Sequence, residues 1–127
     1  MKASDFIAKK LSNNNNHVFS GQGGSVVHIL DSLSRVKGVR IIPSQNEQGA
    51  SLAADAYYRS SGKIGVVIAT SGPGILNTLQ GMACSFYDSI PSLYIAGAPV
   101  TGSIKKNKKL RQLGFQEMEV MDIVKSM

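Results

Sequence analysis

One carboxylate stands where an apolar run gives way to an alanine-rich helix. This residue is Glu47, within the segment Pro43-Ser44-Gln45-Asn46-Glu47-Gln48-Gly49-Ala50. A glutamate at the start of a helix commonly interacts with the free backbone amides or with the positive end of the helix dipole. A carboxyl group there could also act as a catalytic residue. Glu47 is therefore the first candidate for acid–base chemistry.

Two glycine-containing turns carry further groups that could contact a ligand. The first is Gly21-Gln22-Gly23-Gly24, where missing side chains let the backbone approach a flat or anionic molecule. The second is Thr70-Ser71-Gly72-Pro73-Gly74, which supplies hydroxyl groups, and Asn77 follows it. Neither turn is a dinucleotide fingerprint or a phosphate loop, because the third glycine of one and the Lys-Ser or Lys-Thr pair of the other are absent.

The spacing of apolar residues predicts alternating strands and helices. We expect strands at 17–19, 39–42, 64–69 and 92–96, helices at 4–11, 26–33, 48–60 and 75–86, and a final helical segment at 115–124. The strand at 64–69 is apolar on both faces, as expected for a central parallel strand covered by helices. This order predicts a three-layer, doubly wound parallel α/β sheet with helices on both faces. The turns after all four strands, including Glu47 and both glycine turns, should then lie at one edge.

The composition is that of one ordinary globular domain. The chain has 127 residues, of which 43% are hydrophobic and 17% charged. Its single cysteine, Cys84, permits no internal disulfide and lies in an apolar helical context that predicts a core position. No run approaches the roughly 18 apolar residues that a membrane span needs, and no secretory signal is expected. We predict a cytoplasmic protein without a membrane partner.

The positive charge is concentrated in one loop. Of the net charge of +6, five positive charges come from one short run, which leaves +1 for the rest of the chain. The run consists of Lys105, Lys106, Lys108, Lys109 and Arg111. No aromatic residues alternate with these cations, so we expect no nucleic-acid partner. The loop at 97–114 is predicted to be a solvated basic loop, with an anion or polymer site as the alternative.

Five groups of residues occur in order across about residues 2 to 124. They are Glu47-Gln48-Gly49-Ala50 with Ala53-Ala54-Asp55 and Tyr57, Gly62-Lys63, Thr70-Ser71-Gly72-Pro73-Gly74 with Asn77, Asp88-Ser89-Ile90-Pro91, and Gly114-Phe115-Gln116-Glu117. Together they resemble the pyrimidine-binding (PYR) domain of thiamine-diphosphate enzymes, most of all the acetolactate synthase group. The resemblance implies the thiamine-diphosphate-binding fold, with residues 1–127 as a single N-terminal domain cut from a longer chain.

The resemblance also implies a catalytic role for Glu47. In the family, the matching glutamate hydrogen-bonds N1′ of the cofactor aminopyrimidine and assists removal of the thiazolium C2 proton. Thiamine diphosphate then acts as the electron sink for decarboxylation and carboligation of 2-keto acids. The complete protein would be a transferase or a lyase.

The other implied site residues form two groups. The cofactor-binding group comprises, besides Glu47, Gly21, Gln22, Gly23, Thr70, Pro73 and Asn77. The glycine turn would line the pyrimidine by its backbone, and the last three residues would pack or hydrogen-bond around it. The substrate-side group is Phe115 and Gln116.

The diphosphate half of the cofactor has no predicted partner in this chain. Family members hold it through magnesium, with a Gly-Asp-Gly segment and a following Asn on a separate domain, and nothing after Gly97 offers one. We expect no metal ligand here, magnesium bound through a missing domain, and no activity from the chain alone. FAD is possible in the complete protein but is not indicated. The site would form against the diphosphate-binding domain of a neighbouring protomer, which implies a homodimer or homotetramer.

Two departures from the family pattern leave the keto acid open. Asn46 stands where the acetolactate synthase group commonly has histidine, and Gly21-Gln22 replaces the usual aromatic-proline pair. One alternative is the alpha subunit of a two-chain sulfopyruvate or phosphonopyruvate decarboxylase. A continuous reading frame beyond codon 127 would exclude it. The other is a non-enzymatic α/β binding module that uses the basic loop.

Overall fold

The computed structural model describes residues 1–14, 17–107 and 109–127. A parallel sheet forms its centre, with β1 (His17–Ser20), β2 (Arg40–Pro43), β3 (Gly65–Ala69) and β4 (Ser92–Ala96) in the spatial order β2-β1-β3-β4. The predicted parallel α/β sheet is confirmed, with strand ends shifted by at most one residue. Because β1 and β3 are neighbours, the direction of winding reverses between them, and such a switch point is where open α/β sheets bind ligands.

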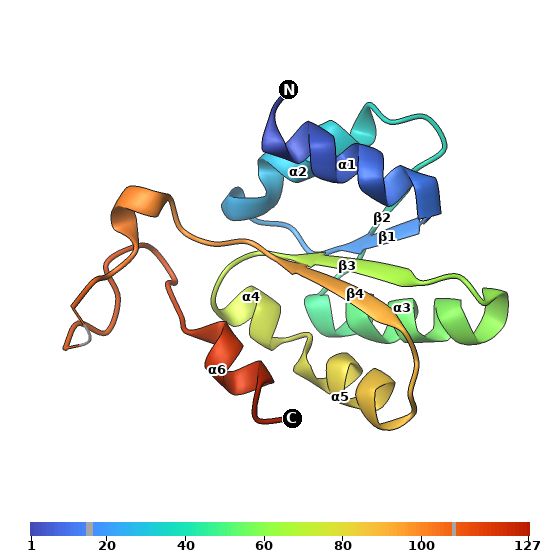
Figure 1. The fold of residues 1–127 in the computed structure, drawn as a ribbon. Coiled ribbons are helices and arrows are strands. Elements are labelled where there is room, and N and C mark those ends of the chain that lie inside the picture. The colour runs from blue at the N-terminus through green and yellow to red at the C-terminus, as the bar shows by residue number, and fades with distance from the viewer. Residues whose placement is uncertain (15–16, 108) are drawn as a thin grey trace.

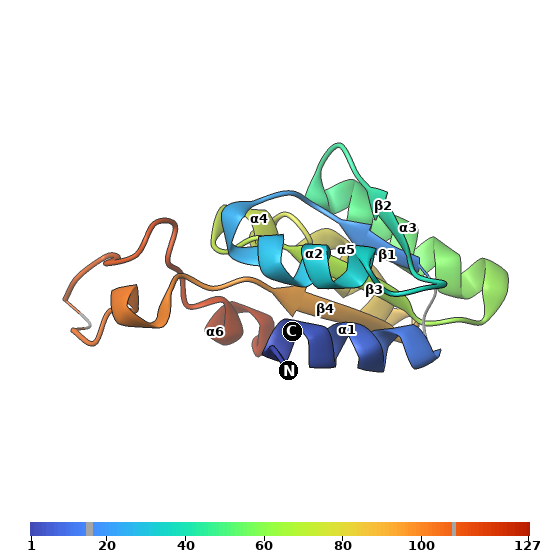
Figure 2. The same cartoon turned by 90° about the horizontal axis from the view of Figure 1, so that it is seen from above.

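Helices cover both faces of this sheet (Figure 1). On one face lie α1 (Ala3–Asn14) and α2 (Val27–Ser34), which is entered through the 3-10 turn η1 (Gly24–Val26). On the other face lie α3 (Glu47–Ser61), α4 (Pro73–Leu76) and α5 (Leu79–Tyr87). Seen from above, α1 and α2 lie in front of the strands (Figure 2). The three-layer architecture is thus the one predicted.

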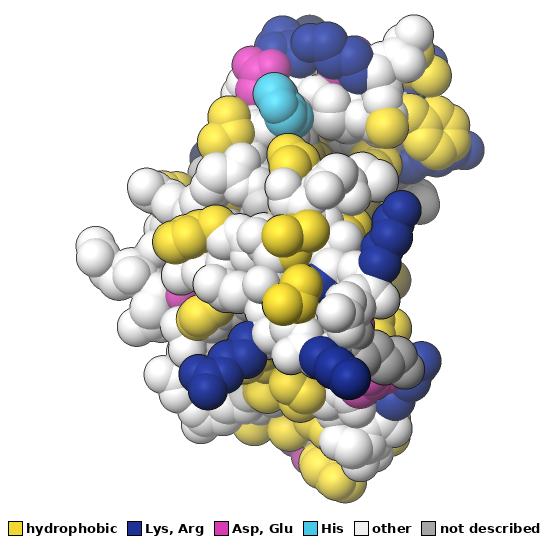
Figure 3. Space-filling model, turned by 90° about the vertical axis from the view of Figure 1, so that its left-hand side faces the viewer, with side chains coloured by type: hydrophobic (Ala, Val, Ile, Leu, Met, Phe, Trp, Pro, Cys, Tyr) yellow, Lys and Arg dark blue, Asp and Glu magenta, His cyan; other side chains and the backbone are white. Residues whose placement is uncertain are grey.

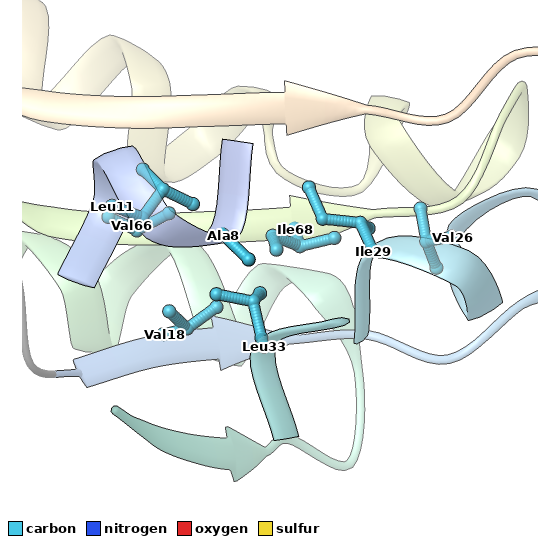
Figure 4. Close-up of a cluster of buried hydrophobic side chains, with 8 residues drawn as sticks. All are labelled: Ala8, Leu11, Val18, Val26, Ile29, Leu33, Val66 and Ile68. Atoms are coloured by element: carbon cyan, nitrogen blue, oxygen red, sulfur yellow. The ribbon is translucent and has the colours of Figure 1, made fainter. Parts of the chain in front are cut away.

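Two apolar clusters hold the layers together. The one under α1 and α2 consists of Ala8, Leu11, Val18, Val26, Ile29, Leu33, Val66 and Ile68 (Figure 4). The one under α3 consists of Phe19, Ala50, Ala54 and Val67. Successive residues of β3 enter opposite clusters because side chains alternate along a strand. All five residues of β3 are buried, so the sites at its carboxyl end rest on a rigid strand.

The expectation of one helix over 75–86 is wrong, because the structure has two helices there, α4 and α5. Thr78 is fully buried, and its hydroxyl donates to the carbonyl oxygen of Ile75 at 2.6 Å, which offers the backbone an alternative to a continuous helix. The buried face of α5 carries Gly81 and Ser85 rather than an apolar stripe. A Cβ on Gly81 would lie 2.4 Å from Cβ of Ser51, so α5 approaches α3 closely through small residues.

Side chains expected in the core of that helix face solvent instead. Cys84 is exposed, and Phe86 is 61% exposed, because the small residues of α5 take the position against α3. The expectation of a helix over 115–124 is also wrong at its start. Gln116 has a φ of 53°, which a right-handed helix cannot accommodate, and α6 (Val120–Val124) begins only later.

The segment between β4 and α6 is a long loop, which continues past the predicted end at residue 114 as far as residue 119. Its only described regular element is η2 (Thr101–Ser103). Lys108 of the basic run lies outside the described residues. Within the ranges that the structure describes, no helix is long and apolar enough to cross a membrane.

Candidate active site

Backbone hydrogen bonds hold the turns after the strands side by side. Gly21 N donates to Ile68 O at 3.0 Å, and Ser44 N donates to Ser20 O at 3.0 Å. These bonds extend the strand pairing into the first glycine turn and the approach to α3. Figure 3 shows this carboxyl edge of the sheet, where hydrophobic side chains lie across the middle with Lys and Arg side chains around them.

The cap of α3 is Asn46, which leaves Glu47 free for another role. Asn46 Oδ1 accepts a hydrogen bond from Gly49 N at 2.7 Å. Glu47 is the first residue of the helix and is half-buried. Its carboxylate accepts a hydrogen bond from Asn77 Nδ2 at 3.1 Å. The structure therefore brings two predicted site residues, Glu47 and Asn77, into direct contact. Asn46, rather than Glu47, caps the helix.

Glycine backbone packs directly against the Glu47 side chain. A Cβ on Gly21 would lie 2.6 Å from Glu47 Cγ and 2.8 Å from Oε1. A Cβ on Gly74 would lie 3.5 Å from the same oxygen and 2.5 Å from Thr70 Cγ2. A side chain on Gly21 would displace the carboxylate, so glycine at this position is a condition of the observed geometry.

Ser25 ties three of the turns together and is not among the predicted site residues. Its Oγ lies 2.8 Å from Thr70 Oγ1 and accepts from Ser71 N at 3.1 Å. A Cβ on Gly97, after β4, would lie 2.0 Å from that same Oγ. A Cβ on Gly23 would lie 2.3 Å from Thr70 Cβ. No sequence signal singles out Ser25 beyond its place after a glycine turn, because its partners come from distant strands.

In the part of the chain that the structure describes, Gln22 lines three hollows at this edge. One, of about 370 Å³, is lined by Val27, Leu30 and Ile41 among others. The other two are lined by Glu47 or by Phe115 and Gln116. The first of these two has a volume of about 530 Å³ and is lined by Gly21, Gln22 and residues 43–47, which include Glu47. The second has a volume of about 570 Å³, and its lining includes Gln22, Gly23, Ser25, Thr70, Phe115 and Gln116. The predicted cofactor-binding residues are therefore divided between the hollows. Gly21 and Glu47 line the first, whereas Gly23 and Thr70 line the second together with Phe115 and Gln116.

Four predicted site residues are exposed. One of them, Gln22, lines both the first and the second hollow, and the other three are Pro73, Asn77 and Phe115. Pro73 is exposed at the start of α4 and lines neither hollow. Asn77 also lines neither hollow, and it reaches the site only through Glu47. Phe115 is 81% exposed at the rim of the second hollow.

The loop behind the second hollow folds around the carboxylate of Glu117. Glu117 accepts hydrogen bonds from the backbone amides of Lys105, Leu113 and Gly114, at 2.7, 2.7 and 3.3 Å. These amides, led by that of Leu113, hold the pKa of the Glu117 carboxyl below its ordinary value. Within the basic run, Lys105 Nζ donates to Arg111 O at 3.0 Å. The predicted site residues do not include Glu117, although it belongs to one of the matched segments.

The first hollow presents one carboxylate among neutral polar groups. Ser44, Gln45 and Asn46 supply hydroxyl and amide groups beside Glu47. Such a surface suits a flat, neutral nitrogen heterocycle that shares a proton with the carboxyl group. Among the described residues, no group of three or more His, Cys, Asp or Glu side chains could hold a metal ion. The first hollow therefore offers one carboxyl group with neutral hydrogen-bonding groups beside it.

Comparison with known proteins supports the same kind of ligand. Residues 1–124 match the family described as thiamine pyrophosphate enzyme, N-terminal TPP binding domain. Acetolactate synthase large subunit from Buchnera aphidicola subsp. Schizaphis graminum is 38% identical over 97% of the chain and 21% of its own length. Acetolactate synthase 2, chloroplastic, from Brassica napus is 37% identical over 86% of the chain and 16% of its own length. The large subunit from Porphyra purpurea is 46% identical over 64% of the chain and 14% of its own length.

Proposed function

The chain belongs to the thiamine pyrophosphate enzyme family as an N-terminal cofactor-binding domain, and we propose that its first hollow binds the aminopyrimidine of thiamine diphosphate. One observation carries this proposal. The Glu47 carboxylate lines the hollow and accepts a hydrogen bond from Asn77, while Asn46 caps the helix in its place. A carboxyl group held in this way is suited to one ring nitrogen of a flat base.

Glycine backbone lies directly beside the Glu47 carboxyl group. The Gly21 backbone packs against the Glu47 side chain, and a Cβ there would come within 2.8 Å of the carboxylate oxygen. Gly23 is likewise packed against Thr70, where no Cβ would fit. Glycine at position 21 therefore leaves the Glu47 carboxyl group in place beside the backbone, where we expect the ring to bind.

When bound, thiamine diphosphate would supply the electron sink for decarboxylation and carboligation of 2-keto acids. Glu47 would hold a proton at N1′ of the pyrimidine, and Asn77 would keep its carboxylate oriented. The backbone of Gly21, Gln22 and Gly23 would support the ring. Phe115 and Gln116, at the adjacent hollow, would face the keto acid.

The chain spans about one-fifth or less of the length of the relatives named above. We propose that it acts as the PYR domain of a longer enzyme resembling acetolactate synthase. The diphosphate and magnesium would be held by another domain, contributed by a neighbouring protomer in a homodimer or homotetramer. The 127 residues alone would then be inactive.

The function is tested by replacing Glu47 in the complete enzyme. We expect Glu47→Gln to lower the rate of carbon dioxide release from a 2-keto acid such as pyruvate by about 10² to 10⁴-fold, the usual contribution of acid–base catalysis. The matched control is Glu119→Gln, which removes the same charge from an exposed position and should leave the rate unchanged. A Glu47→Gln enzyme with normal turnover would refute the proposal.

A further inference from the structure

The buried side chain of Glu117 binds backbone amides of the loop that leads to Phe115 and Gln116. Glu117 is 9% exposed, and its Oε1 accepts from Lys105 N at 2.7 Å. Its Oε2 accepts from Leu113 N at 2.7 Å and from Gly114 N at 3.3 Å. The carboxylate therefore joins residue 105 to residues 113 and 114, and it closes the loop that holds the basic run.

Three charge-assisted hydrogen bonds from backbone amides make a strong anchor. Such bonds are shorter and about twice as strong as bonds between neutral groups. Backbone amides also fix the path of the chain, whereas bonds to long side chains would fix only the side chains. The chain is thus attached to a buried carboxylate at residue 105 and again at residues 113 and 114, on both sides of the basic run.

The adjacent residue, Gln116, is held in a conformation that it does not adopt readily. Its φ of 53° lies in the left-handed region, which is uncommon for residues other than glycine. A Cβ on Gly72 would lie 2.3 Å from Gln116 O, so this carbonyl rests directly on the turn after β3. Backbone in such a conformation persists where surrounding contacts over-determine it, and this is common at ligand sites.

The glycine before this segment is packed just as closely. Gly114 is buried, and a Cβ on it would lie 2.6 Å from Pro99 Cβ and 2.9 Å from Ser103 O. The segment is therefore fixed on one side by the loop after β4 and on the other by the turn after β3. Between these two supports, Phe115 is 81% exposed at the rim of the second hollow.

We propose that Glu117 is a positioning residue that sets Phe115 and Gln116 at the second hollow. Glu117 lines none of the three hollows described above, so it acts through the loop rather than by contact with a ligand. The inference rests on the proposed function only in that it takes this hollow as the keto-acid side. The anchoring of the loop itself is independent of any cofactor.

The first part of the test measures the loop in the complete enzyme. Hydrogen–deuterium exchange with mass spectrometry follows peptides that cover residues 104–118 in Glu117→Gln and in the control Glu119→Gln. The amide group of glutamine has one acceptor oxygen where the carboxylate has two, so at least one of the three backbone amides loses its partner. We expect exchange in these peptides to become at least about tenfold faster in Glu117→Gln only, since one amide is then bonded to water.

The second part separates positioning from a general loss of structure. We expect Glu117→Gln to raise KM for the 2-keto acid about five- to twentyfold, as for a loss of binding at that side. The exchange rate of the C2 proton of bound thiamine diphosphate, which reports on Glu47, should stay within about twofold of the wild type. Glu117→Asp keeps the charge but is one methylene shorter, and we expect it to behave like Glu117→Gln.

The other possible results of these measurements would each contradict one part of the proposal. Unchanged loop exchange in Glu117→Gln refutes the anchor, and faster exchange with an unchanged KM refutes the positioning role. A wild-type KM in Glu117→Asp would show that the charge matters rather than the bonds. If the wild-type enzyme turns over no 2-keto acid, the proposed function fails, while the exchange data still decide whether Glu117 holds the loop.

Discussion

The carboxylate of Glu47 is held from two sides at the entrance of α3. Asn77 donates to one oxygen, and the Gly21 backbone packs against the other side of the carboxyl group. Asn46 carries out the capping that a glutamate at a helix start would otherwise perform. The side chain is therefore kept in one orientation and directed at the first hollow.

Asn77 is expected to matter because it orients this carboxylate. In the complete enzyme, Asn77→Ala should slow exchange of the C2 proton of bound thiamine diphosphate about tenfold, since one charge-assisted hydrogen bond is lost. The control is Gln80→Ala, because Gln80 is also exposed but pairs with Gln48. NMR after acid quench measures both rates. Equal rates in the two variants would show that Asn77 does not position Glu47.

At the scale of elements, Asp55 joins α3 to α5. Asp55 is 7% exposed and accepts hydrogen bonds from Arg59 Nε at 2.5 Å and from Ser85 Oγ at 2.9 Å. The guanidinium of Arg59 lowers the pKa of the Asp55 carboxyl, with a smaller contribution from Ser85. Because Gly81 lets the two helices approach closely, this network lies at their contact and helps to hold α3, whose first residue is Glu47.

Asp55→Ala should lower the free energy of unfolding by about 1–3 kcal/mol, because Arg59 and Ser85 lose a buried partner. Asp31→Ala is the control. Asp31 pairs with Arg35, and both are 53% exposed, so its loss should cost less than about 1 kcal/mol. Urea unfolding followed by circular dichroism measures both values, and equal losses would show that the buried network does not stabilise the helix pair.

The Asp55 contribution should also depend on pH in a definite direction. A depressed pKa in the folded state means that the bonds stabilise fully above the ordinary value of 3.8. Their contribution is lost as the pH falls through the lower pKa of the folded protein. The difference between wild type and Asp55→Ala should therefore be constant near neutral pH and shrink below about pH 3.8.

The pattern of apolar residues along the chain predicted those strands and helices whose side chains are buried in the core. The strand at β3 was predictable because its residues are apolar on both faces, and the start of α3 because its alanine-rich run follows Glu47. The break between α4 and α5 was not predictable from periodicity, since it depends on the hydroxyl of Thr78 bonding to Ile75. The late start of α6 likewise follows from the left-handed conformation of Gln116.

The candidate site was predictable to the extent that it consists of turns after parallel strands. Gly21, Glu47 and Asn77 were predicted as site residues and make direct contact. Ser25 and Glu117 were not, because their partners are separated from them in the sequence or are backbone amides. Side chains that bind backbone leave no residue-type pattern from which to predict them.

At the scale of the whole molecule, the first and second hollows lie at one edge of the sheet and share Gln22. This arrangement places the proposed pyrimidine side next to the proposed keto-acid side. Our proposal assigns the diphosphate to another domain, so the 127-residue chain would make only part of the contacts to the cofactor.

We therefore expect the isolated chain to bind thiamine diphosphate weakly or not at all. Its affinity should be at least about 100-fold lower than that of the complete enzyme, which corresponds to roughly 2.7 kcal/mol of missing contacts. Calorimetry with and without magnesium measures this difference. Tight, magnesium-dependent binding by the isolated chain would show that the proposed division of the site between domains is wrong.

The central claim is that Glu47 assists proton removal from the bound cofactor. Its most direct test is the exchange rate of the C2 proton of thiamine diphosphate bound to the complete enzyme, measured by NMR after acid quench. In Glu47→Gln we predict exchange at least about 10²-fold slower, with the fold and most of the cofactor binding retained. Exchange at a nearly normal rate in this variant, with cofactor bound, would contradict the account.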